Sequence, residues 1–299
     1  MLDNIIARVT GGALSRIDGQ LGTAAPGPVS LWLINPAGVV FGANASLDVQ
    51  GSLYLSTADY LRFADGTTFS AGGAGGPSTL SAAPVASFGF MGAPAGITMN
   101  EAVLSIPEGN TFALVGGDIS INDARLEAPA GHAQVISVAS QGEAPLTADG
   151  IDVSGFSALG DIDIFRNTSR LPVTGNLDVS GGLFTGTQAG DITVRGGSLD
   201  SDSGFFNSVS FSDQNSGRTV IEVTGEANLT GNTQVLSSSF FGAGDAGDVI
   251  IRAGELVVVD NASISTESQG AGDAGDVTLV ADNIFMDERG KVFSNTFDS

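Results

Sequence analysis

A repeat of about 28 residues constrains the fold of this chain more than any other feature. The sequence GAGDAGDVIIRA begins at Gly242, and GAGDAGDVTLVA begins at Gly270, 28 residues later. Pairs of apolar residues, separated by one mostly polar residue, recur at Ile119/Ile121, Ile162/Ile164, Ile192/Val194, Ile221/Val223, Val249/Ile251 and Val277/Leu279. This alternation is typical of a strand with one face in a core and the other in solvent.

Each late period holds three short strands. VIIRA, ELVVVDN and SISTES follow one another, and a glycine-rich return leads to the next period. Repeats built from two helices per unit are disfavoured, because no 3.6-residue apolar period is sustained. Three strands and three turns make one coil of a parallel β-helix, and such coils bury apolar side chains only against their neighbours. The sequence predicts an all-β solenoid of roughly a dozen coils, with Ile192, Ile221, Val249 and Val277 stacked in one file.

Charge and composition limit the partners and the chemistry. The chain carries 33 acidic and 11 basic residues, a net charge of −22. Such a surface repels nucleic-acid phosphates and anionic bilayers. Because the chain has no cysteine, disulfides and zinc–cysteine sites are excluded. The single histidine, His132, is interpreted as a turn or strand-edge residue and not as a catalytic group.

A tight corner interrupts the apolar stretch SLWLINPAGVVFGANASLDVQG (30–51). Asn35, Pro36 and Gly38 suit the first, second and fourth positions of a type I turn. The Asn35 side chain is expected to bond its own backbone two residues on. No titratable residue occurs in 29–44, so acid–base chemistry has no group to use here. Trp32 lies in the apolar run and is expected in the core, not on a sugar-binding surface.

Four blocks of sequence carry a resemblance to a known family. They are IIARVTGGALSRIDGQL, LWLINPAGVVFGANASLDVQGSLYLSTA, FGFMGAPAGITMNEAVLSIPEGNTFALVGGDISI and the late GDAGDV coils. Together they resemble the filamentous-haemagglutinin-like exoproteins of two-partner secretion, most specifically over residues 5–120. We expect a secretion domain over 1–140, truncated at its N-terminus, and a β-helical stem over 141–299 with 28–30 residues per coil. The glycine-rich stretch 63–90 is expected to be a surface loop that leaves the helix, and it is the best candidate boundary between an irregular part and the regular stack.

The resemblance implies a secreted or cell-surface adhesin that is not an enzyme. Proteins of the family cross the inner membrane by a signal peptide and are recognised by an outer-membrane β-barrel transporter. They then fold outside as a right-handed parallel β-helix. We expect a monomer without a cofactor, whose surface ligand is unknown. No signal peptide is recognisable at the start of this chain, which suggests a truncated or mis-started N-terminus and places its own export in question.

The family motif is Asn-Pro-Asn-Gly followed by an apolar residue. Here Asn35, Pro36, Gly38 and Val39 match, whereas Ala37 replaces the second asparagine. The resemblance therefore predicts a transporter-recognition motif made of Asn35, Pro36, Gly38, Val39, Phe41 and Gly42. The replacement keeps the turn but removes one amide that a transporter could contact.

Two alternatives remain open from the residues. Parallel β-helices also carry polysaccharide lyases and hydrolases, although one Trp, two Tyr and 11 basic residues equip this chain poorly for such a site. A calcium-stabilised repeat is the other alternative, with Asp245, Asp248, Asp273 and Asp276 as candidate ligands. One coil should place these carboxylates in stacked pairs, which either raise each other's pKa, recruit a cation, or remain solvated where Gly-Asp opens each strand.

Overall fold

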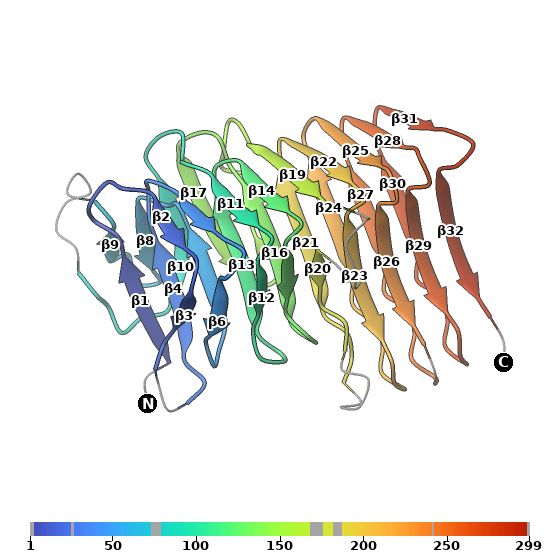
Figure 1. The fold of residues 1–299 in the computed structure, drawn as a ribbon, viewed down its shortest axis with the longest axis horizontal. Coiled ribbons are helices and arrows are strands. Elements are labelled where there is room, and N and C mark those ends of the chain that lie inside the picture. Colours follow the sequence, from blue (N-terminus) through green and yellow to red (C-terminus); the bar gives the residue numbers. More distant parts are fainter. Residues whose placement is uncertain are drawn as a thin grey trace.

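The computed structural model describes residues 3–24, 27–72, 79–167, 176–181, 187–240 and 242–297, and these contain strands and no helix. Three long parallel sheets run along the molecule (Figure 1). The first sheet has nine strands, in spatial order β1 (Asn4–Arg8), β4 (Ser30–Ile34), β7 (Leu53–Ser56), β13 (Thr111–Gly116), β16 (His132–Ser137), β21 (Asp191–Gly196), β24 (Thr219–Val223), β27 (Val249–Arg252) and β30 (Val277–Val280).

The second sheet repeats this pattern beside the first. Its nine strands are β2 (Ser15–Ile17), β5 (Val39–Phe41), β11 (Ile97–Asn100), β14 (Ile119–Asn122), β19 (Asp161–Phe165), β22 (Ser198–Asp202), β25 (Glu226–Thr230), β28 (Glu255–Val258) and β31 (Asn283–Met286). The third sheet comprises β12 (Val103–Ser105), β15 (Arg125–Glu127), β20 (Leu177–Asp178), β23 (Phe205–Ser210), β26 (Gln234–Ser239), β29 (Ser263–Ser268) and β32 (Lys291–Thr296). The parallel pair β3 (Gln20–Gly22) and β6 (Ser46–Asp48) adjoins β12.

The chain visits the three sheets in turn, which confirms the parallel β-helix. Strands β24, β25 and β26 form one coil, and β27, β28 and β29 stack on them strand by strand. The first sheet gains one strand per coil, so the described part of the chain makes nine coils, fewer than the dozen expected. The difference arises because two segments leave the helix. They form an antiparallel sheet of β8 (Tyr60–Phe63), β9 (Thr68–Ser70), β10 (Val85–Phe90), β17 (Gly142–Thr147) and β18 (Gly150–Ile151).

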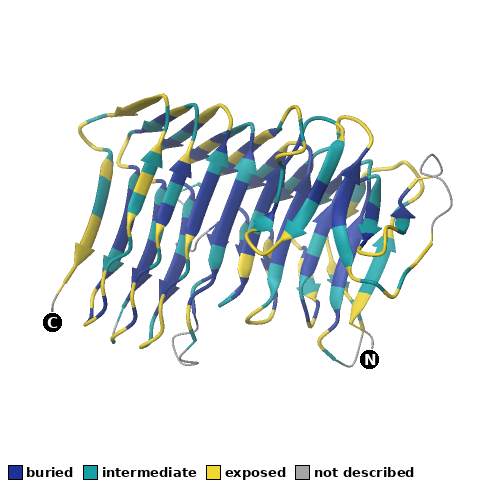
Figure 2. Ribbon diagram, turned by 180° about the vertical axis from the view of Figure 1, so that it is seen from behind, coloured by how far each residue is buried: buried dark blue, intermediate teal, exposed yellow. Residues whose placement is uncertain are grey.

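Two apolar cores result from this arrangement. The core inside the helix is continuous from Leu31 to Ile264, and Figure 2 shows its buried residues running along the strands. A second core lies between the outer face of the first sheet and the antiparallel sheet, and Trp32 and Phe88 belong to it. Trp32 is only 5% exposed and stacks on Tyr54 with ring centroids 3.8 Å apart, which confirms its predicted place in a core.

The stretch 63–90 leaves the helix as predicted, but it is not simply a surface loop. Strands β9 and β10 lie within it, and both are paired in the antiparallel sheet. Residues 73–78 of this stretch lie outside the described part. The expectation of a loop was wrong because the many glycines of this stretch made its short apolar strands, which cover the first sheet, difficult to recognise in the sequence. The predicted domain boundary at residue 140 stays a prediction.

The recurring apolar pairs do not form a single file. Ile119 and Ile162 are partners in the second sheet, whereas the later pairs lie in the first sheet. Ile192 pairs with Thr219, and Ile221 pairs with Val194, so the predicted alignment of Ile192 with Ile221 was wrong by two residues. A shift of two residues keeps every side chain on its own face of a strand, which is why Ile221 is still buried. The predicted alignment of Ile221 with Val249 was wrong by the same two residues, because Val249 pairs with Thr219. Val249 pairs with Val277 as predicted.

Close approach of successive coils explains the Gly-Asp repeat. Gly217, Gly247 and Gly275 occupy equivalent corners before strands of the first sheet, and a Cβ on Gly247 would collide with the carbonyl oxygen of Gly217. Hydroxyl groups of the third sheet bind the same corners: Ser237 Oγ donates to the Gly217 carbonyl at 2.8 Å, and Thr266 Oγ1 donates to the Gly275 carbonyl at 2.6 Å. Glycine at this position therefore permits the coil spacing that pairing between strands requires.

We expect Gly247→Ala to lower the free energy of unfolding by about 2 kcal/mol or more, because the added methyl group has to push two backbones apart. Gly11→Ala is the control, since a Cβ there meets no atom within 4 Å, and its effect should stay within about 0.5 kcal/mol. Urea unfolding followed by circular dichroism measures both. Equal stabilities of the two variants would contradict the steric explanation.

Candidate functional site

The predicted recognition motif forms the corner between the first and second sheets. Strand β4 ends at Ile34, the turn occupies residues 35–38, and β5 begins at Val39. The backbone N–H of Gly38 donates to the carbonyl of Asn35 at 3.0 Å, the bond that closes a four-residue turn. Gly38 has a φ of 103°, in the region that favours glycine. The turn is therefore well defined, as its residues predict.

Asn35 is the centre of the corner and is fully buried. Its Nδ2 donates to Ala13 O at 3.0 Å, to Ser15 Oγ at 2.8 Å and to Gly38 O at 3.0 Å. Its Oδ1 accepts the backbone N–H of Ala37 at 3.0 Å, which confirms the predicted bond two residues on. The side chain therefore closes the turn and also ties it to the preceding coil, a contact that the sequence did not indicate.

The other motif residues are buried or half-buried. Val39 and Phe41 are 0% exposed and point into the core inside the helix. Pro36, Ala37 and Gly42 are half-buried at the surface of the corner. The structure thus brings the six predicted residues together, but none of them presents a freely exposed side chain.

An aspartate that sequence reasoning missed supports the next corner, between β5 and β6. Asp18 Oδ1 accepts the backbone N–H of Asn44 at 2.9 Å, and its Oδ2 accepts the Asn44 side-chain amide at 3.0 Å. These hydrogen bonds hold the pKa of Asp18 below its ordinary value. Gly42 lies against the same carboxylate, which leaves no space for a Cβ. The sequence does contain a signal for this contact, because the pair Asp18-Gly19 lies one coil before Gly42 and Asn44.

The four candidate calcium ligands stack one coil apart, as the period predicts. Two of the four carboxylates bind the backbone of the next coil: Asp245 Oδ1 accepts the N–H of Asp273 at 2.9 Å, and Asp248 Oδ1 accepts the N–H of Asp276 at 2.9 Å. Within the described ranges, no three His, Cys, Asp or Glu side chains gather as a metal site would need. Calcium binding stays a prediction, and the geometry assigns these carboxylates a capping role.

His132 is the first residue of β16 and is exposed. Its Nδ1 lies 3.6 Å from Asp191 Oδ2. The interpretation as a strand-edge residue is confirmed, and His132 also lines a hollow on the first sheet.

A pair of aspartates on the outer face of the second sheet was not foreseen. Asp163 and Asp200 are register partners on β19 and β22. Partial burial raises the pKa of each carboxyl, and repulsion from Asp200 raises that of Asp163 further. Like charges directly opposite one another on adjacent strands destabilise a sheet, so this pair opposes folding when both groups are ionised.

A known protein family matches this chain. The family described as the TPS secretion domain matches residues 2–159, a range that contains the Asn35 corner and the whole antiparallel sheet. No curated protein matches the chain.

We expect Asp163→Asn to raise the free energy of unfolding at neutral pH by less than about 1 kcal/mol, because it removes a charge that the folded state disfavours. A carboxyl whose pKa is raised by folding costs stability above that pKa, and this cost disappears as the pH falls below the ordinary value of 3.8. The gain should therefore be largest near pH 7 and vanish toward pH 3. Thermal melts of both proteins across this range provide the measurement, and a gain that persists at pH 3 would exclude the repulsion.

Proposed function

Because the chain belongs to the family of the TPS secretion domain, we propose that it acts as an adhesin of a two-partner system and has no enzymatic activity. The family makes the chain a secreted exoprotein, with a transporter in the outer membrane as its partner. The proposal adds a role for the Asn35 corner in recognition and a binding role for the β-helix at the cell surface. The burial of the Asn35 side chain is the observation that carries the first part.

Burial decides when a transporter can contact the motif. Asn35, Val39 and Phe41 are closed off from solvent in the folded chain. A transporter can therefore contact these side chains only before the corner has folded. We propose that it binds the segment 30–42 in extended form, and that Asn35 then locks the corner when the chain folds outside.

The β-helix suits folding after export, since each coil needs only the preceding coil as its template. The corner at Asn35 belongs to the second coil, and its bonds to Ala13 and Ser15 join that coil to the first. A corner that locks early would provide the surface on which later coils stack. Recognition and folding would thus use the same residues at successive times.

A binding function without catalysis agrees with how the basic residues are used. Arg62 pairs with Glu143, Arg125 with Asp178, Arg195 and Arg252 with Glu222, and Arg289 with Asp260. Five of the 11 basic residues are therefore bound to carboxylates of the protein, which reduces the positive charge available to hold an anionic polysaccharide. Release of reducing ends from acidic polysaccharides would overturn the non-enzymatic part of the proposal.

We also propose that the stem needs no cofactor, because backbone N–H groups of the next coil already bind the carboxylates of Asp245 and Asp248. Thermal melts with and without millimolar calcium test this. A rise in melting temperature with calcium would favour the calcium-stabilised repeat instead.

Export of Asn35→Ala separates recognition from stability. The substitution removes the four hydrogen bonds of a buried side chain and should lower the free energy of unfolding by about 2 to 3 kcal/mol. If the transporter contacts Asn35, the variant should accumulate in the periplasm when it is expressed behind a signal peptide together with the transporter. Immunoblots of culture medium and periplasm measure the exported fraction.

Asn176→Ala is the matched control. Asn176 is also buried, and its amide donates to Ala124 O at 2.9 Å and accepts from the Phe205 N–H at 3.0 Å. Asn176→Ala should also lower the free energy of unfolding, although by less, because it removes two hydrogen bonds and not four. Asn176 lies beyond the matched domain, so this variant should not be retained in the periplasm. Equal export of the two variants would remove the recognition role and leave Asn35 as a structural residue.

A further inference from the structure

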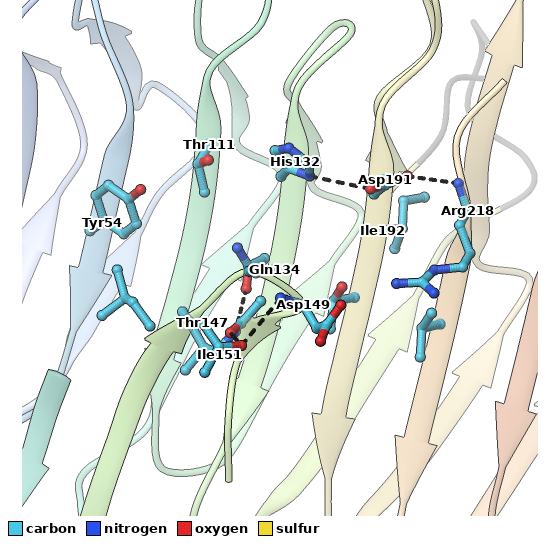
Figure 3. Close-up of a pocket in the computed structure, with 15 residues that line it drawn as sticks. Tyr54, Thr111, His132, Gln134, Thr147, Asp149, Ile151, Asp191, Ile192 and Arg218 are labelled. Atoms are coloured by element: carbon cyan, nitrogen blue, oxygen red, sulfur yellow. Dashed lines mark hydrogen bonds and ion pairs between the residues drawn. The ribbon is translucent and has the colours of Figure 1, made fainter. Parts of the chain in front are cut away.

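A hollow of about 200 Å³ lies on the outer face of the first sheet. Its floor comes from β7, β13, β16, β21 and β24, and its roof is the turn from Leu146 to Ile151 between β17 and β18. Figure 3 shows Tyr54 and Arg218 at opposite ends, with His132, Gln134 and Asp149 between them. The hollow therefore joins strands of several coils under a segment that leaves the helix.

At Ile151, the turn that forms the roof is hydrogen-bonded to side chains of the first sheet. The backbone N–H of Ile151 donates to Gln134 Oε1 at 3.0 Å, and Arg195 Nη1 donates to the carbonyl of Ile151 at 2.7 Å. Both side chains project from the first sheet. The hollow is thus closed on this side by bonds and not by packing alone.

Strand β17, which leads into the roof, is held by side chains of the antiparallel sheet. Glu143 on this strand accepts the Tyr60 hydroxyl at 2.6 Å, Arg62 Nε at 2.9 Å and the Ser87 hydroxyl at 3.3 Å. The Arg62 guanidinium holds the pKa of Glu143 below its ordinary value. With both ends held, the hollow exists before any ligand arrives, as is usual for binding sites.

The lining offers both donors and acceptors. In the described part of the chain, neither the Arg218 guanidinium nor the Asp149 carboxylate has a side-chain hydrogen bond or an ion pair. His132 lies beside Asp191, and Thr193, which is only 9% exposed, lines the floor. Separate positive and negative groups around one small space suit a ligand that donates and accepts at neighbouring atoms.

Apolar surface completes the lining. Tyr54, Leu146 and Val220 border the same hollow. Sugar rings present C–H groups on their faces and hydroxyl groups at their edges, which suits a site with apolar walls and a few polar groups. The volume accommodates about one sugar ring.

We propose that this hollow binds a single neutral sugar residue of a surface glycan. An acidic sugar fits less well, because Asp149 and Asp191 face one arginine in a protein of net charge −22. This site would give the adhesive role proposed above a ligand class. Only the origin of the glycan, a cell surface, rests on that role. Binding is expected at a dissociation constant of about 1 mM, as is usual for a ligand this small.

Saturation-transfer NMR on the purified chain tests the site without any export step, so its result is independent of transporter recognition. The probes are galactose, glucose, mannose and N-acetylglucosamine, with glucuronic acid as the charged comparison. The variants are Arg218→Gln, Asp149→Asn and Thr193→Val. The controls are Arg252→Gln and Glu288→Gln, whose side chains lie outside the hollow.

We expect transfer to at least one neutral sugar, weakened at least fivefold in Arg218→Gln and Asp149→Asn and unchanged in the controls. Thr193→Val keeps the size of the side chain and should weaken transfer if the hydroxyl contacts the sugar. No transfer to any neutral sugar, or equal transfer to wild type and all three hollow variants, would overturn the proposal. Stronger transfer to glucuronic acid would overturn the choice of a neutral ligand.

Discussion

Parallel pairing between successive coils is the constraint on which the rest of this structure depends. Coils at strand spacing leave no room for a side chain where their corners meet, so Gly217, Gly247 and Gly275 stack at the entry to the first sheet. The same closeness places the carboxylates of Asp245 and Asp248 within reach of backbone N–H groups of the next coil. The Gly-Asp repeat therefore satisfies a steric requirement and a hydrogen-bonding requirement at once.

Departures from the regular coil create the features that matter for function. Strands β8, β9, β10, β17 and β18 leave the helix and cover the outer face of the first sheet, where Trp32 and Phe88 form a second core. The match to the TPS secretion domain ends at residue 159, and all five strands lie within it. The hollow extends further, because its floor includes residues of β21 and β24. The matched domain and the coils that follow it thus build one surface together.

The repeat predicted the all-β class and the parallel β-helix because period and alternation are local properties of the sequence. The turn at Asn35 and the burial of Trp32 were predictable for the same reason. The antiparallel sheet was not, since Tyr60 meets Glu143 across 83 residues and glycines surround the strands between them. Nor was the register at Ile221, which depends on how long each turn is and not on the apolar pattern. The hollow depends on both of these long-range arrangements, so no local motif could have indicated it.

Most of the corner carboxylates share one direction along the stack. Asp18 accepts from Asn44, Asp118 from Asp161, Asp191 from Arg218 and Asp245 from Asp273, so the acceptor side chain belongs to the earlier coil at these four corners. The last coil reverses the direction, because Asp287 accepts the N–H of Asp260. At the four corners that share the direction, a folded coil therefore presents carboxylates that can accept hydrogen bonds from N–H groups of the coil that follows. Ionised carboxylates are the strongest neutral-pH acceptors for such groups, and an acidic chain can supply one at many corners. This polarity favours growth from the secretion domain toward the C-terminus, and it gives part of the large negative charge a role in assembly as well as in solubility.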